Sequence, residues 1–413
     1  MDINEKIDYC LSCKGKQCKS GCPLENDITE IIKLIKEEKY EEAYKVSTNT
    51  SVLQSICGRI CPHKSQCEGN CVRAIKGKSV EIGEIESFLG DKAIEENYSM
   101  SELPHISNNK KVAVVGSGPA GLTCAAFLAR SGVEVTIYEK YDKLGGILRY
   151  GIPNFRLDKD ILDKAINKIL DLGIIVKYNT EIGKNINWED LRQNYDAIFL
   201  AIGANISWKM NIPGEELDGV YGGNELLEKS NHPDYEGKTV IISGGGNVAM
   251  DCARTVKRLG AKSVKVVYRR SEKEMPAESK EIEAAKNEGV EFLFQNNIIK
   301  IGGNSKVEQI ECIKTKLVQK DGDSRLSPVN IENSNYIIDA DYVIMAIGST
   351  TELSTIESLS LKTNKYGYIV VDDDYETSQK NIFAGGDLIG EKSTVAWAAK
   401  CGREAAKKIL KKI

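Results

Sequence analysis

The stretch that decides the fold is Lys111-Val112-Ala113-Val114-Val115-Gly116-Ser117-Gly118-Pro119-Ala120-Gly121. Its first five residues are a short apolar run, which predicts a buried β-strand, and a helix is expected over Leu122–Arg130. Gly116 permits the tight turn between the two, Gly118 lets a pyrophosphate approach the backbone, and Gly121 allows close helix–strand packing. The pyrophosphate is expected at the N-terminus of the helix, on unpaired N–H groups.

A second strand is expected at Val133–Tyr138, directly before Glu139. A carboxylate at that place accepts hydrogen bonds from the ribose hydroxyls of FAD or NAD. Strand, glycine turn, helix, strand and acid occur in the required order, so this βαβ unit predicts a dinucleotide site and not a glycine turn of an unrelated α/β fold.

The pattern recurs further along the chain. A strand at Thr239–Ser243 leads into Gly244-x-Gly246-x-x-Ala249, a helix to Leu259 and a strand at Ser263–Tyr268. An acid is absent after this strand, and Arg269 and Arg270 stand there instead. Guanidinium groups bind a 2′-phosphate bidentately, so the second site is expected to prefer NADPH over NADH, although such arginines do not exclude NADH.

Two aspartate-led strands, Ala197–Ala201 and Tyr342–Ala346, are each followed by Ile-Gly and are natural crossing points between domains. We therefore expect an α/β fold with two Rossmann-like dinucleotide-binding domains, the second inserted in the first. The first domain would resume near Gly348 and finish with a helix over Val395–Lys412, whose lysine-rich end suits the helix dipole.

Eight of the twelve cysteines fall within the first 71 residues, in two runs. The runs are Cys10-x2-Cys13-x4-Cys18-x3-Cys22-Pro23 and Cys57-x3-Cys61-Pro62-x4-Cys67-x3-Cys71. Compact runs that include Cys-Pro are typical of iron–sulfur ligation, and the last cysteine of a run often serves the other cluster. Structural zinc usually takes two pairs of ligands separated by a longer loop and stays the alternative.

The other candidate ligands are isolated. Cys124, Cys252, Cys312 and Cys401 are expected to be small buried hydrophobes. The second nucleotide domain contains no Cys-x-x-Cys, which argues against a disulfide mechanism of the thioredoxin reductase type. His63 lies inside the second cysteine run and is expected in a solvent-exposed loop. Between the two cysteine runs, the helical spacing of apolar residues from Ile28 to Ile35 predicts a helix with Asn26 or Asp27 as N-cap. The polar segment Asn97–Asn109 predicts a linker.

Composition excludes several classes of function. The 413 residues are 41% hydrophobic and 28% charged, enough for two or three folded domains. A net charge of −4 gives no basic field for nucleic acid, and the longest apolar runs are too short to span a bilayer. The N-terminus has no apolar signal region, and many cysteines without one indicate metal ligation in a reducing cytoplasm. We therefore expect a cytoplasmic protein without a nucleic-acid or membrane partner.

The chain resembles the small subunit of NADPH-dependent glutamate synthase over nearly its whole length. It is similar also to the N-terminal part of dihydropyrimidine dehydrogenase and to the large subunit of NADH-dependent ferredoxin:NADP oxidoreductase. The motifs that carry the resemblance are Cys57-Gly-Arg-Ile-Cys-Pro62, Gln66-Cys-Glu-Gly-Asn-Cys71, Gly145-Gly-Ile-Leu-Arg-Tyr-Gly-Ile-Pro153, Gly244-Gly-Gly-Asn-Val-Ala-Met-Asp251, Tyr268-Arg-Arg-Ser-Glu-Lys-Glu-Met-Pro276 and Ala384-Gly-Gly-Asp387.

The resemblance implies how the cysteines are shared between two [4Fe–4S] clusters. Cys10, Cys13, Cys18 and Cys71 would hold one cluster, and Cys22, Cys61 and Cys67 would hold the other. In the family the remaining ligand is a side-chain oxygen from an Ile-Gly-x-x-Glu/Gln stretch, which is Ile82-Gly-Glu-Ile-Glu86 here. Glu86 would therefore complete the second cluster, and Cys57 would be a bystander.

The resemblance also implies which residues contact the nucleotides. FAD would be bound by Gly116, Gly118, Pro119, Ala120, Gly121, Glu139, Lys140, Gly145, Gly146, Ile147, Arg156, Gly386, Asp387, Thr394 and Val395. NADPH would be bound by Gly244, Gly245, Gly246, Asn247, Val248, Arg269, Arg270, Ala346, Ile347 and Gly348. The domains would be an α-helical iron–sulfur domain over 1–106, an FAD-binding domain over 107–205 and 347–413, and an NADPH-binding domain over 206–346.

The expected function is that of an oxidoreductase subunit that passes electrons between NADPH, FAD and two clusters, without an acid–base catalytic residue. The partner would be a large subunit with FMN or another catalytic domain, or ferredoxin, and the direction stays open. The alternatives are an electron-bifurcating or ferredoxin-linked subunit, an electron-input module of the dihydropyrimidine dehydrogenase type, and a zinc-binding module that senses NADPH.

Overall fold

The computed structural model describes residues 2–100, 108–229, 231–319, 326–352 and 357–413. Most of the expected linker Asn97–Asn109 therefore lies outside the described residues. The chain forms two compact units: unit 1 comprises Met1–Arg149, Asn154–Ala204 and Thr351–Ile413, and unit 2 comprises Tyr150–Pro153 and Asn205–Thr350. The main segment of unit 2, Asn205–Thr350, is thus inserted between Asn154–Ala204 and Thr351–Ile413 of unit 1, which agrees with the predicted insertion of one nucleotide domain in the other.

Unit 1 contains a five-stranded parallel sheet of order β16-β4-β1-β2-β3. Its strands are β1 (Lys111–Val115), β2 (Glu134–Tyr138), β3 (Ile175–Lys177), β4 (Ala197–Leu200) and β16 (Ile382–Ala384). All but the first residue of β1 and β2 are buried, which explains why both read as continuous apolar runs. The glycine loop and Glu139 follow two neighbouring strands, at the carboxyl edge of the sheet.

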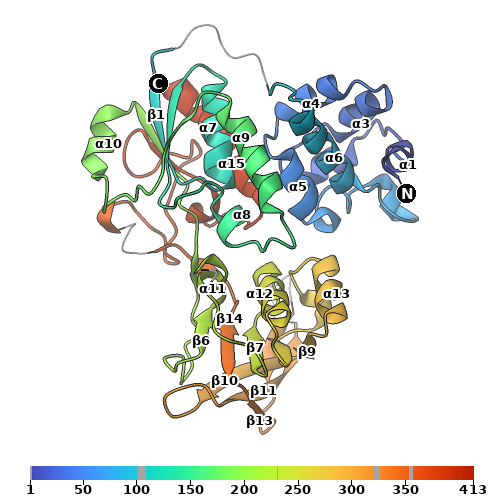
Figure 1. Cartoon of the computed structure of the whole chain (residues 1–413), viewed down its shortest axis with the longest axis vertical. Coiled ribbons are helices and arrows are strands. Elements are labelled where there is room, and N and C mark those ends of the chain that lie inside the picture. Colours follow the sequence, from blue (N-terminus) through green and yellow to red (C-terminus); the bar gives the residue numbers. More distant parts are fainter. Residues whose placement is uncertain (1, 101–107, 230, 320–325, 353–356) are drawn as a thin grey trace. The chain divides into compact units, whose positions relative to one another are not determined.

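The helices of the nucleotide-binding part of unit 1 follow its strands (Figure 1). They are α7 (Pro119–Ala129), α8 (Ile147–Tyr150), α9 (Lys159–Leu170), α10 (Trp188–Asn194), the 3-10 turn η4 (Gly386–Ile389) and α15 (Val395–Lys412). Helix α7 is buried on nearly every side, because it packs against the sheet, α9 and α15. It begins at Pro119, three residues before the predicted start, because proline suits the first helical position.

The N-terminal part of unit 1 is a set of short helices. They are α1 (Ile3–Asp8), α2 (Gln17–Gly21), α3 (Ile28–Lys36), α4 (Tyr40–Thr48), α5 (Gln54–Ile60) and α6 (Ile82–Glu95), with 3-10 turns η1 (His63–Ser65) and η2 (Val72–Ile75). The predicted helix appears as α3, and its N-cap is Asp27, whose side chain accepts from the Glu30 N–H. Helices α5 and α6 pack against α9, and α5 also contacts α15 (Figure 1).

Unit 2 contains a second five-stranded parallel sheet, of order β6-β14-β7-β8-β9. Its strands are β6 (Val220–Gly222), β7 (Thr239–Ser243), β8 (Ser263–Tyr268), β9 (Glu291–Phe294) and β14 (Tyr342–Met345), and its helices are α11 (Gly223–Lys229), α12 (Asn247–Arg258) and α13 (Ser279–Asn287). The predicted bounds of β7 and β8 are confirmed.

An antiparallel sheet in unit 2 is absent from the sequence prediction. It consists of β10 (Asn296–Gly302), β11 (Gln309–Val318), β12 (Ser327–Asn330) and β13 (Tyr336–Asp339). The chain enters unit 2 through β5 (Ile206–Ser207) and leaves through β15 (Ser349–Thr350), which pair antiparallel. No helix in the described part of the chain is both long enough and apolar enough to cross a membrane.

Candidate functional site

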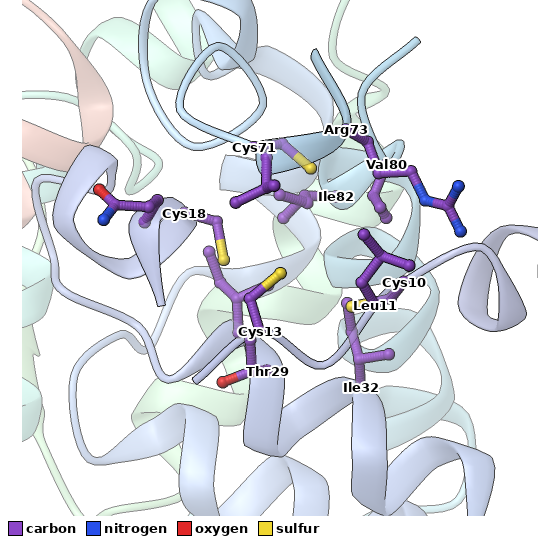
Figure 2. A pocket seen from close by; sticks show the side chains of 13 residues that line it. Cys10, Leu11, Cys13, Cys18, Thr29, Ile32, Cys71, Arg73, Val80 and Ile82 are labelled. Atoms are coloured by element: carbon purple, nitrogen blue, oxygen red, sulfur yellow. The ribbon is translucent and has the colours of Figure 1, made fainter. Parts of the chain in front are cut away.

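Four cysteines line one pocket in the N-terminal part of unit 1 (Figure 2). Cys10 and Cys13 lie in the loop between α1 and α2, Cys18 is in α2 and Cys71 precedes η2. Figure 2 shows their sulfur atoms directed toward a common space. We call these residues the first thiol set.

The surroundings of the first thiol set suit a positively charged group, which the four cysteines would bind as thiolates. Burial raises the pKa of Cys18 to about 11, and the charges of Cys10 and Cys71 add to the effect. Four neighbouring thiolates require a positively charged centre, which iron provides. In the described residues no three such side chains meet at a single-ion position.

A second group of side chains lies deeper. Burial raises the pKa of Cys22 to about 12, and the nearby charges of Glu86 and Cys61 raise it further. The pKa of Cys67 is raised by burial and then by the charges of Glu86, Cys22 and Cys61. Each of these groups is therefore an electrostatic neighbour of the others. We call Cys22, Cys61, Cys67 and Glu86 the second ligand set.

Glu86 is the unusual member of this set. Burial raises the pKa of its carboxyl to about 8, opposed by a hydrogen bond from Asn26 Nδ2 to Glu86 Oε1 of 3.1 Å. The residue is half-buried, and a desolvated carboxyl beside three thiols would be disfavoured as an anion without a cation to share. An iron centre supplies that cation, so these four residues also fit a cluster.

His63 corrects the sequence prediction of a solvent-exposed histidine. Its side chain is buried, and Nε2 lies 3.1 Å from the carbonyl oxygen of Cys57. Gly83 makes this possible, since a Cβ there would lie 2.4 Å from His63 Cε1. The Cys61 thiol donates to the Cys57 sulfur, and this bond, together with burial, raises the pKa of Cys61. Cys57 is thus adjacent to the second ligand set, and its backbone carbonyl oxygen is in contact with the His63 ring.

The first glycine loop forms a cradle for a dinucleotide. Gly116 has a φ of +96°, and a Cβ on Gly121 would lie 2.0 Å from the Gly116 oxygen. Gly118 faces open space, because a Cβ there would meet nothing within 4 Å. Glu139 is buried, and its carboxylate accepts the Ser117 N–H (3.1 Å) and the Ser117 hydroxyl. The open glycine and the anchored acid are what a pyrophosphate and a ribose need.

Distant segments complete this cradle. A Cβ on Gly146 would lie 2.9 Å from Gly118 Cα, and the Gly145 N–H donates to Ser117 Oγ over 3.0 Å. Gly386, with a φ of +73°, lies against Ala120, and burial raises the pKa of the neighbouring Asp387 to about 6.

The remaining residues expected to contact FAD have the following places. Pro119 opens α7, Ile147 opens α8, Thr394 caps α15 and Val395 is its first residue. Lys140 is exposed beside the Tyr141 ring, and Arg156 is half-buried in the loop between α8 and α9.

The second glycine loop has the same construction in unit 2. Gly244 has a φ of +142°, and a Cβ there would lie 2.2 Å from the Ala346 oxygen. The loop therefore lies against the end of β14, where Ile347 and Gly348 follow. Gly246 caps α12, which begins with Asn247 and Val248, and Gly245 packs on the Tyr268 ring.

The two arginines after β8 differ in their surroundings. Arg269 is exposed and Arg270 is half-buried. The Nε of Arg270 is buried and has no hydrogen-bond acceptor within the described residues. A buried N–H without an acceptor is costly, and a phosphate oxygen would remove that cost. This atom supports a 2′-phosphate site at this strand end.

Sequence reasoning missed three residues that organise these sites. Asn26 contacts Glu86, Ser117 joins Glu139 to Gly145, and the Ala396 N–H donates to the Cys61 sulfur. Ser117 stands inside the glycine motif, so its position was a usable signal. The other two act across long sequence separations, which no local pattern reveals. The four isolated cysteines are fully buried, which confirms that prediction.

Comparisons with known proteins agree with this arrangement. Residues 110–405 match the family model described as pyridine nucleotide-disulphide oxidoreductase, and residues 2–98 match that of dihydropyrimidine dehydrogenase domain II, 4Fe-4S cluster. The small chain of glutamate synthase [NADPH] from Escherichia coli (strain K12) is 36% identical, over 98% of this chain and 90% of that protein. The NADPH-Fe(3+) oxidoreductase subunit beta from Geobacter sulfurreducens is 37% identical, over 86% of this chain and 54% of that protein.

Solved structures agree on the fold. Mycobacterium tuberculosis FprA in complex with NADPH has a TM-score of 0.66 at 19% identity, over 73% of this chain and 84% of that one. Thioredoxin reductase from Lactococcus lactis has a TM-score of 0.56 at 21% identity, over 74% of this chain and 99% of that one. At such identities the likeness concerns the fold alone. The family matches go further, and the chain belongs to the pyridine nucleotide-disulphide oxidoreductase family, as an NADPH-linked FAD and 4Fe-4S oxidoreductase related over nearly its whole length to the small chain of glutamate synthase.

Proposed function

We propose that the chain passes electrons between NADPH and a partner redox subunit through FAD and two [4Fe–4S] clusters. The proposal is supported by the pocket that Cys10, Cys13, Cys18 and Cys71 line, and by the mutual electrostatic influence of Cys22, Cys61, Cys67 and Glu86. The first thiol set would hold one cluster and the second ligand set the other. The FAD would lie on the glycine loop of unit 1, and NADPH on that of unit 2.

The chemistry belongs to the bound groups: a flavin exchanges two electrons with a nicotinamide and single electrons with iron–sulfur clusters. The chain's residues bind, orient and enclose these groups. Glu139 and Ser117 fix the ribose end of the FAD cradle, and Arg270 supplies the N–H for a 2′-phosphate. This assignment needs no acid–base residue.

The positions of the two sets within unit 1 favour an order of transfer. The Ala396 N–H, in the first turn of α15, donates to the Cys61 sulfur, and α15 begins at Thr394 and Val395 of the proposed FAD site. The second ligand set is therefore the one adjacent to the flavin domain. Electrons would pass from FAD to this set and then to the first thiol set.

The first thiol set lies at the surface, where a partner can reach it. Leu11 and Val72 line its pocket and are 54% and 37% exposed, and Ile75 nearby is 76% exposed. Apolar side chains exposed beside a redox centre are typical of an interaction site. Among the relatives are small and beta subunits, so we propose a partner subunit at this surface.

The test is iron content and electron paramagnetic resonance of anaerobically purified protein reduced with NADPH. We expect about eight irons and one FAD per chain, and two distinct reduced-cluster signals. Cys71→Ser and Cys18→Ser should remove the same signal, whereas Cys67→Ser should remove the other, each with loss of about four irons. Cys57→Ser is the matched control and should retain both. If Cys71→Ser and Cys67→Ser abolish the same signal, or Cys57→Ser abolishes one, the proposed ligand sets are wrong.

A further inference from the structure

Asn26 contacts two members of the second ligand set at once. Its side-chain Nδ2 donates to Glu86 Oε1 over 3.1 Å, and its backbone N–H donates to the Cys22 sulfur. The residue is only 3% exposed. Since Asp27 caps α3, the Asn26 side chain is not needed for capping and is available to Glu86.

The orientation of the Asn26 amide is set by Glu86. Thr50 Oγ1 lies 2.6 Å from Asn26 Oδ1, to which it donates, and 3.3 Å from the Ser47 carbonyl oxygen, so a hydroxyl that can donate or accept fits the amide in either orientation. An ionised carboxylate has only acceptor atoms, and it therefore selects the NH2 side of the amide. The Thr50 contact is compatible with this orientation.

The segment that carries Asn26 is anchored to the flavin-binding part of unit 1. Arg403, in α15, is 4% exposed, and its Nη1 donates to the Leu24 oxygen (2.7 Å) and to the Thr50 oxygen (3.0 Å). One guanidinium thus fixes the backbone on both sides of the Asn26–Thr50 contact. Asn26 is held rigidly enough to impose a direction on Glu86.

We propose that Asn26 is a positioning residue for Glu86: by binding Oε1 it would hold the carboxylate with Oε2 left to ligate the second cluster. This proposal rests on the proposed function, in which Glu86 is a ligand. An N–H donor on an anionic ligand stabilises the reduced cluster, which carries one more negative charge. Its loss therefore lowers the reduction potential of the second cluster and leaves the first unchanged.

The decisive variant is Asn26→Leu, which keeps the shape of the side chain and removes the donor. In the anaerobic holoprotein we expect both clusters to be present and the signal of the second cluster to change in its g-values. At a fixed ambient potential the ratio of reduced to oxidised second cluster should fall about tenfold, which is about 59 mV for a one-electron couple. Ser47→Ala is the control, because Ser47 is another buried residue of the same helical region; this variant should change neither signal.

A double-substitution cycle shows whether Asn26 acts through Glu86. In a Glu86→Cys background the ligand no longer accepts the amide N–H as a carboxylate, so adding Asn26→Leu should cause no further shift. Unchanged signals and potentials in Asn26→Leu, or equal shifts of both clusters, would overturn the role of Asn26 while leaving Glu86 as a ligand. If Glu86→Cys itself leaves the second signal unchanged, the ligand assignment fails instead, and Asn26 has nothing to position.

Thr50→Val provides a second variant in case Asn26→Leu loads no iron. It removes only the hydroxyl that donates to the amide, so we expect a shift in the same direction and smaller than tenfold. A folded, fully loaded Thr50→Val protein with the wild-type potential would overturn the proposal.

Discussion

Arg270 and Glu139 occupy comparable places at the ends of strands in the two nucleotide domains, and in the proposed function their opposite charges suit different nucleotides. Because Arg270 Nε is buried without an acceptor in the described structure, Arg270→Ala should weaken NADPH binding by about 1.5–3 kcal/mol, or roughly 10- to 150-fold in KM. NADH lacks the 2′-phosphate, so its KM should change by less than about twofold. Steady-state kinetics with both nucleotides measures this, and Lys300→Ala, an exposed cation of the same unit, is the control. A parallel loss for NADH would contradict the phosphate assignment.

Glu288 is a residue whose negative charge stabilises unit 2. Burial alone would raise the pKa of its carboxyl, but hydrogen bonds from Arg258 and Arg254 lower it from 4.5. The folded state therefore binds fewer protons than the unfolded state near pH 4. Its stabilisation is complete above pH 4.5 and is lost as pH falls through the lowered value.

Glu288→Gln should therefore destabilise unit 2 by about 2 kcal/mol at pH 7, and the loss should shrink as pH drops below 4.5. Denaturant unfolding at several pH values measures the difference. Glu272→Gln is the matched control, since Glu272 and its partner Lys286 are 50% and 42% exposed, and it should cost less than about 0.5 kcal/mol. A pH-independent loss at Glu288 would show that packing, not charge, is responsible.

At the residue scale, the sequence predicted the candidate ligands better than it predicted the residues that hold those ligands in place. Cysteine spacing and glycine motifs are local patterns, and the structure brings those residues together. His63 was wrongly predicted to be exposed, because its burial depends on Gly83, which belongs to another helix. Asn26 was considered only as a helix cap, because its contact with Glu86 spans 60 positions.

Helix α15 joins the cofactor sites of unit 1 through a close contact with α7. Gly402 allows it, because a Cβ there would lie 2.1 Å from the oxygen of Ala120, a residue of the first glycine loop, where FAD is proposed to bind. Gly402→Ala should cost about 1–3 kcal/mol by overpacking, more than the helix propensity that alanine gains, and should weaken FAD retention. Thermal unfolding and FAD fluorescence measure both. Lys407→Ala, on the exposed side of α15, should change neither. If Gly402→Ala raised the melting temperature instead, α7 and α15 would be able to move apart at little cost.

Elements were predictable where one physical signal dominated. The bounds of β7, β8 and α15 are those that the sequence predicted, because short apolar strands beside a glycine loop and a lysine-rich helix end are local signals. The antiparallel sheet of β10–β13 was missed. Its strand β13 alternates half-buried and exposed residues, and β12 is half-buried or exposed throughout, so neither has the apolar run of a buried strand.

At the scale of the whole molecule, the two units differ in what stabilises them. Unit 2 has its own hydrophobic cores on both sides of its parallel sheet, built from aliphatic residues such as Val240 and Ile241. The N-terminal part of unit 1 consists of short helices, and all eight proposed cluster ligands lie in them or in their connections. These helices also bury aliphatic side chains such as Leu53, Ile56 and Leu89, and the clusters are expected to add to the stability of that small core.

Removal of iron should therefore act on one part of the chain. After anaerobic chelation, hydrogen exchange of peptides from residues 2–98 should accelerate by orders of magnitude, because the cross-links between their helices are lost. Peptides from 205–350 should keep their protection, since their cores contain none of the proposed ligands. Segments of α9 and α15 that pack against α5 should respond partially. Reconstitution with iron and sulfide is the control and should restore protection. Unchanged exchange in residues 2–98 would show that the helices pack without the clusters, and the cysteines would then serve electron transfer alone.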